Sequence, residues 1–238
     1  MVRAGIKNVL VWLTLFSMAM GFLESAVVVY LREIYYPSGF SFPLTPLSGR
    51  IAVIELIREM ATMLMLLSMG FLAGKNARQR FAWFIYCFAV WDIFYYVFLK
   101  ITLLWPASFF TWDILFLIPT IWTGPVVTVI MVSFTMILLA GMILYTEEKT
   151  SRMKITRFTV IPTVIGAVLI FGSFIWSFSS YVISTFSMKA ILSIDNVQNA
   201  MLKFIPADFN WYLFIGGEIA LMAGIYSLYT DYRKASLP

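Results

Sequence analysis

The sequence contains no histidine and only one cysteine, Cys87, among its 238 residues. Without histidine the chain cannot build a His-ligated haem, most catalytic zinc or copper sites, or a Ser–His or Cys–His nucleophile pair. A single cysteine cannot form an intrachain disulfide, and its apolar neighbours indicate a small hydrophobic residue. We therefore expect no cofactor and no metal centre, because any metal would have to bind through oxygen ligands alone.

Charged residues are also scarce, at 12% of the chain, whereas a soluble domain carries about a quarter. Hydrophobic residues make up 61%, and the mean hydropathy is +0.89. So much apolar surface needs a bilayer as its solvent, which predicts an all-α, polytopic membrane helix bundle forming one transmembrane domain over residues 1–238. The net charge of +5 has no basic stripe that would indicate nucleic acid as a partner.

Six apolar runs are long enough to cross about 30 Å of hydrocarbon as helices. Lys and Arg are concentrated at both termini and in loops 74–80 and 146–157, which predicts a multi-pass protein of the plasma membrane with both termini cytoplasmic. The loops 32–50, 105–111 and 185–208 are then expected outside. The six predicted spans cover residues 8–31, 51–73, 80–104, 125–145, 158–184 and 209–230.

Two further segments are expected on the outer side. The apolar run 112–145 is too long for one span and contains Pro119 and a Trp-Thr-Gly-Pro break at 122–125. We predict a broken or re-entrant outer half-helix over 109–121, with one long kinked helix as the alternative. Apolar residues recurring every three or four positions over 187–205 predict an amphipathic helix at the outer interface.

Charged side chains occur inside the predicted spans, where a charge at mid-membrane costs about 2.5–3.5 kcal/mol. Most of them fall in the outer half of the bilayer when each span is measured at 1.5 Å per residue. Spacing places Glu55, Arg58 and Glu59 on one helix face, and Asp92, Tyr96 and Lys100 along another. The predicted substrate- or ion-binding residues are Glu24, Glu55, Arg58, Glu59, Asp92, Tyr96, Lys100, Asp113 and Glu218.

Acidic residues outnumber basic ones in this set. Arg58 can pair with Glu55 or Glu59, and Lys100 can approach Asp92, but some carboxylates are left unpaired. We expect either that these carboxyls are protonated or that a cation is bound. The alternative is that the charges only fix helix packing, as the small residues Gly216, Ala220 and Gly224 would do for the last span.

No phosphate-binding loop, H-E-x-x-H zinc motif or G-x-S-x-G elbow occurs in the sequence. The acidic excess in the outer half of the spans leads to the first hypothesis, which is an outward-facing intramembrane site that binds and passes a proton, cation or small substrate. The alternatives are an outer-leaflet enzyme acting on a lipid or lipid-linked substrate, and a non-catalytic subunit of a larger membrane complex. Expected partners are membrane lipids, a proton or cation, and a second copy or other membrane subunits.

Overall fold

The computed structural model describes residues 6–149, 155–186 and 200–236, and most of them form long helices. The predicted all-helical bundle is confirmed, and each helix matches a predicted span to within a few residues. The helices are α1 (Ile6–Tyr35), α2 (Gly49–Ala73), α3 (Ala77–Leu103), α4 (Val126–Lys149), α5 (Arg157–Thr185) and α7 (Trp211–Ser236).

Five helices in the described part of the chain, α1, α3, α4, α5 and α7, are long and apolar enough to cross a membrane. This supports a multi-pass membrane protein. α2 is of similar length but carries Arg50, Glu55, Arg58 and Glu59 in its first half, and it is not among the five. The count of six spans, the plasma membrane location and the cytoplasmic termini therefore stay predictions.

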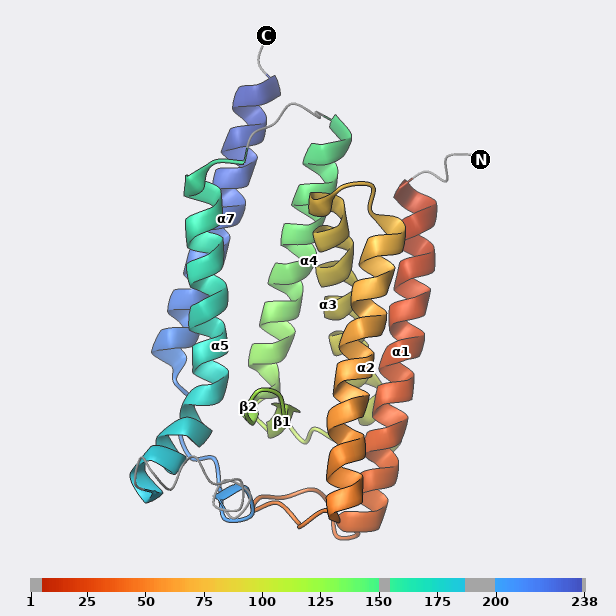
Figure 1. Cartoon of the computed structure of the whole chain (residues 1–238), viewed down its shortest axis with the longest axis vertical. Coiled ribbons are helices and arrows are strands. Elements are labelled where there is room, and N and C mark those ends of the chain that lie inside the picture. Colours follow the sequence, from red (N-terminus) through yellow and green to blue (C-terminus); the bar gives the residue numbers. More distant parts are fainter. Residues whose placement is uncertain (1–5, 150–154, 187–199, 237–238) are drawn as a thin grey trace.

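The helices form two groups joined by α4 (Figure 1). α3 packs against α1, α2 and α4, while α5 packs mainly against α7, and α4 also contacts α7. We call the end of the bundle where α1 and α3 end and α2 and α4 begin the hairpin end. α1 begins and α7 ends at the opposite end (Figure 1).

Close packing of α5 on α7 depends on glycines, and one of them, Gly224, belongs to the row predicted from the sequence. A Cβ on Gly166 would lie 2.7 Å from the carbonyl oxygen of Gly217, and one on Gly217 would lie 2.9 Å from that of Gly166. A Cβ on Gly216 would meet nothing closer than 3.9 Å. A Cβ on Gly224 would meet Thr163 of α5, so Gly217 and Gly224 form the close contact, whereas Gly216 of the predicted row does not.

The prediction of a half-helix over 109–121 is wrong, and so is the alternative of one long kinked helix. This segment and the four residues after it form an antiparallel hairpin of β1 (Trp112–Phe116) and β2 (Trp122–Pro125), with Trp112 opposite Pro125 and Asp113 opposite Gly124. Pro119 has no N–H to continue a helix, and the aromatic residues flanking it favour strands. Gly124 of β2 packs closely on α5, since a Cβ there would lie 3.1 Å from the ring of Phe174 and that ring would have to shift.

The hairpin lies between the two helix groups near the hairpin end (Figure 1). β2 contacts α5 and α4, so the hairpin closes part of the space between α4, α5 and the first three helices. The predicted amphipathic helix 187–205 falls mostly on residues 187–199, which lie outside the described residues. At its end, Ala200 and Phe204 are buried and pack with Phe178 of α5.

Candidate functional site

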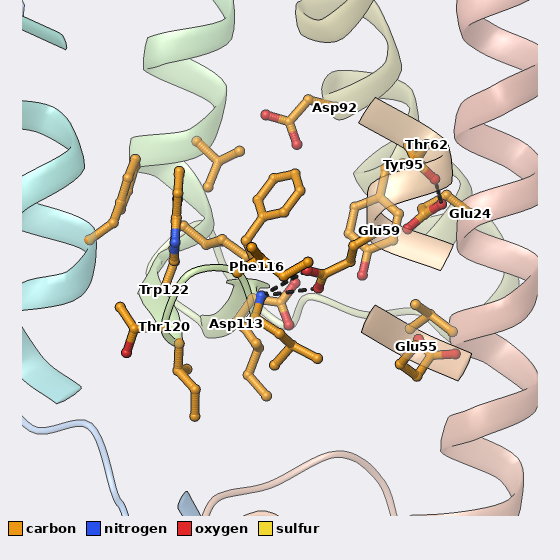
Figure 2. Close-up of a pocket in the computed structure, with 18 of the residues that line it drawn as sticks. Glu24, Glu55, Glu59, Thr62, Asp92, Tyr95, Asp113, Phe116, Thr120 and Trp122 are labelled. Atoms are coloured by element: carbon orange, nitrogen blue, oxygen red, sulfur yellow. Dashed lines mark hydrogen bonds between the residues drawn. The ribbon is translucent and has the colours of Figure 1, made fainter. Parts of the chain in front are cut away.

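A cavity of about 1100 Å³ lies between the two helix groups at the hairpin end (Figure 2). Residues of α1, α2, α3, the hairpin, α4 and α5 line it, and most of its wall is apolar. Its charged lining residues are five carboxylates, from Glu24, Glu55, Glu59, Asp92 and Asp113, and two guanidinium groups, from Arg32 and Arg58.

Arg58 is the centre of the first group of charges. Its Nε and Nη2 atoms donate to Glu55 Oε2 at 2.8 and 2.6 Å, and Nη1 forms an ion pair with Glu24. Thr62 Oγ1 donates to the other oxygen of Glu24 at 3.1 Å. The expectation that Arg58 pairs with one neighbour on its own helix is confirmed for Glu55, and the Glu24 bond in addition ties α2 to α1.

Glu59 holds the turn of the hairpin. Both of its carboxylate oxygens accept the backbone N–H of Leu117 at 3.0 Å, and the residue is only 7% exposed. Among the described residues no cation forms an ion pair with it. The Glu59 carboxylate thus accepts from a backbone N–H of the hairpin that has no partner in the pairing of its two strands.

Asp113 is the centre of the second group of charges, with Arg32 and Tyr96. Arg32 Nη2 donates to Asp113 Oδ1 at 3.3 Å, and the Tyr96 hydroxyl donates to Oδ2 at 3.1 Å. The Arg32 guanidinium also lies 3.8 Å from the ring centroid of Trp105 and 4.5 Å from that of Phe40. Asp113 lies in the hairpin, outside the membrane-spanning helices, where burial raises the pKa of its carboxyl to about 6 although Arg32 opposes that shift.

Arg32 was missed from the sequence because it was assigned to the outer loop. α1 in fact continues to Tyr35, so Arg32 still lies in the helix. A signal was present, since Glu24 and Arg32 are eight residues apart and so share one face of a continuous helix.

Asp92 faces the cavity without a cation. Its Oδ2 accepts from Ser133 Oγ of α4 at 3.0 Å, and the described residues offer it no ion pair. Figure 2 shows the side chains of Asp92, Tyr95 and Glu59 extending into the same space.

Two predicted site residues lie outside the cavity. Lys100 is exposed, and its Nζ donates to the carbonyl oxygens of Leu104 and Pro106 at 3.1 and 2.9 Å. It caps the end of α3 instead of approaching Asp92, because those carbonyls have no helical partner. Glu218 accepts from Thr135 Oγ1 of α4 at 2.7 Å; Thr135 lines the cavity, whereas Glu218 does not.

Aromatic side chains line much of the cavity. Phe116 of β1 lies 6.1 Å from Phe88, 6.2 Å from Trp91 and 5.3 Å from Trp122, measured between ring centroids. Trp91 in turn stacks on Tyr95 at 6.4 Å. We call these five residues, Phe88, Trp91, Tyr95, Phe116 and Trp122, the aromatic wall; all of them line the cavity.

The described residues contain no group of three or more Asp, Glu or Cys side chains placed to hold a metal ion. Comparison with protein-family models, curated proteins and solved structures found no match to this chain.

Proposed function

We propose that this protein is a membrane carrier that binds a small substrate or cation in the cavity and passes it through the membrane. The observation that supports this is the cavity itself: a space of about 1100 Å³ among long apolar helices, lined by five carboxylates and two arginines. Charged groups are expensive in such surroundings, and those that face an open cavity mark substrate or ion pathways by default.

The arrangement of the charges also favours binding over packing alone. Charges that only fix helix packing would be paired and would leave no space between them. Here Arg58 and Arg32 are paired, but Glu59 and Asp92 have no ion-pair partner among the described residues and line open space.

A second candidate function is that of an enzyme acting on a lipid or lipid-linked molecule. The observation that favours it is the separation of α2 from α5, which pack against α3 and α7 respectively and face each other across the cavity. A lipid could reach the cavity sideways through that gap, and the carboxylates could serve as general acid and base.

The test fills the cavity without changing its charge. Ala52 of α2 lines the cavity, whereas the next residue, Val53, is 55% exposed and does not line it. Small molecules that co-purify with the full chain in nanodiscs are identified by mass spectrometry and compared with empty nanodiscs. We expect Ala52→Trp to lose the enriched molecule and Val53→Trp to keep it.

Reconstitution into liposomes then separates the two functions. A carrier moves the identified molecule across the membrane unchanged, whereas an enzyme converts it without net movement. If Ala52→Trp retains the co-purified molecule at the wild-type level, the cavity is not the binding site and both candidates fail.

A further inference from the structure

We propose that the ligand of this cavity is an organic cation, an amine or quaternary ammonium group on an apolar body, bound with its charge beside the carboxylates of Glu59 and Asp92. This inference rests on the proposed function and names the class of substrate. It follows from the charges left unpaired, from two buried donors without partners, and from the composition of the cavity wall.

The charges lining the cavity do not balance. Arg58 pairs with Glu55 and Glu24, and Arg32 pairs with Asp113. Five carboxylates thus face two guanidinium groups, and Glu59 and Asp92 are the two that form no ion pair among the described residues. Lys100 cannot supply one, because it is exposed and bonded to the carbonyls at the end of α3. A cationic ligand completes this balance, whereas an anion would increase the excess.

Two residues that line the cavity each carry a buried donor without a partner among the described residues. Trp91 and Arg32 line the cavity and are 5% and 8% exposed. Trp91 Nε1 and Arg32 Nη1 have no hydrogen-bond partner in the described part of the chain. A buried donor left unpaired destabilises the folded protein. A ligand with an acceptor oxygen near its cationic group would satisfy such a donor.

The aromatic wall suits the same class of ligand. Aromatic rings attract organic cations through their negative faces, and they recognise quaternary ammonium groups in this way. Tyr95 lies near Asp92 at the cavity surface. The ring of Trp91 stacks on the ring of Tyr95. Carboxylates and aromatic faces therefore meet at one place, where a cation gains from both.

The volume and polarity of the cavity argue against a bare inorganic ion. The cavity volume of about 1100 Å³ lies slightly above the usual range for small-molecule pockets, about 300–1,000 Å³. A hydrated metal ion would leave most of the apolar wall in contact with water, whereas an apolar body would cover it. The carboxylates can bind the charge, and the remaining wall can bind the hydrocarbon.

The test compares two probes of the same shape and opposite charge. Tetraphenylphosphonium and tetraphenylborate each carry four phenyl rings around one charged atom. Binding of each radiolabelled probe to the full chain in nanodiscs is measured at equilibrium, with partitioning into empty nanodiscs subtracted. We expect saturable binding of tetraphenylphosphonium, at least tenfold tighter than any saturable binding of tetraphenylborate.

Variants then place the cation. Asp92→Asn and Glu59→Gln each remove one negative charge and should weaken tetraphenylphosphonium binding at least tenfold. Glu33→Gln removes the same charge from an exposed position of α1 outside the cavity and should leave binding unchanged. Asp92→Glu keeps the charge and should stay within about threefold of wild type, which guards against loss of binding through misfolding.

The outcomes separate this inference from the proposed function. Equal saturable binding of both probes, preference for tetraphenylborate, or unchanged binding in Asp92→Asn and Glu59→Gln overturns the cationic ligand. The carrier hypothesis survives these results if Ala52→Trp still abolishes binding of the co-purified molecule. If Ala52→Trp leaves tetraphenylphosphonium binding unchanged, the probe binds elsewhere and the inference fails.

Discussion

Breaking the ion pair between Arg32 and Asp113 should destabilise the protein strongly and in a pH-dependent way. The two residues are 8% and 2% exposed, and their charged atoms are 3.3 Å apart. Removing one partner of a buried pair leaves an uncompensated charge and costs about 3–5 kcal/mol, whereas replacing both by apolar residues is close to neutral. We therefore expect Asp113→Asn to lower the free energy of unfolding by about 3–5 kcal/mol at pH 8, where the carboxyl of Asp113 is ionised.

Arg32→Gln should behave differently from Asp113→Asn because its remaining partner can take up a proton. The pKa of Asp113 is already raised by burial to about 6, and without the opposing guanidinium it rises further. A raised pKa favours the fold when the carboxyl is protonated, and that contribution is lost as the pH rises through the folded-state pKa. The cost of Arg32→Gln should therefore be smaller at pH 5 than at pH 8 by about 1 kcal/mol or more.

The free energy of unfolding can be measured in bicelles by steric trapping at pH 5 and pH 8. The control is the double variant Arg32→Met with Asp113→Leu, which should lie within about 1–2 kcal/mol of wild type at both pH values. The reasoning is refuted if both single variants lie within about 1 kcal/mol of wild type, or if Arg32→Gln shows the same pH dependence as Asp113→Asn.

Three further predictions concern packing and hydrogen bonds elsewhere in the bundle. Gly217→Ala should lower the free energy of unfolding by about 1–3 kcal/mol because its Cβ would meet α5, whereas Gly216→Ala should be near neutral; an equal effect would contradict the α5–α7 packing. Glu59→Ala should speed hydrogen exchange of the Leu117 amide about tenfold or more, because a hydrogen bond to a charged group stabilises by about 1.5–3 kcal/mol. Exchange at the wild-type rate would show that Glu59 does not hold the hairpin. Asp231→Ala should speed hydrogen exchange of the Thr156 amide in the same assay. Asp231 accepts from Thr156 N–H at 3.2 Å and from the hydroxyls of Thr156 and Thr159. An unchanged exchange rate would show that Asp231 does not stabilise the start of α5.

The helices could be predicted from the sequence because a bilayer leaves the chain few options. In a bilayer each backbone N–H and C=O group must form its hydrogen bond within the protein, so an apolar run of about 20 residues or more forms a helix independently of the neighbouring segments. The connection over 109–125 had no such constraint. Its strands are bonded to each other, and Glu59 bonds to the turn, so its conformation depends on partners that are distant in sequence.

The candidate site was predicted in part for the same reason. Helical spacing placed Glu55, Arg58 and Glu59 on one helix face. Because a charged side chain facing lipid is unfavourable, that face was expected to point into the bundle. The spacing of residues does not predict where a helix ends or which residues contact its last turn. Arg32 was missed because α1 extends to Tyr35. Lys100 lies outside the cavity because its Nζ bonds to free carbonyls at the end of α3.

Composition and local periodicity were enough to predict that this chain lies in a membrane, where its long helices are, and that they carry a group of acidic residues. The packing of the helices against one another determines which charges are paired, that a hairpin follows α3, and that an open cavity adjoins Glu59 and Asp92. Pairing and cavity volume depend on distances between helices. No local pattern encodes those distances, since they result from how side chains of all the helices pack together.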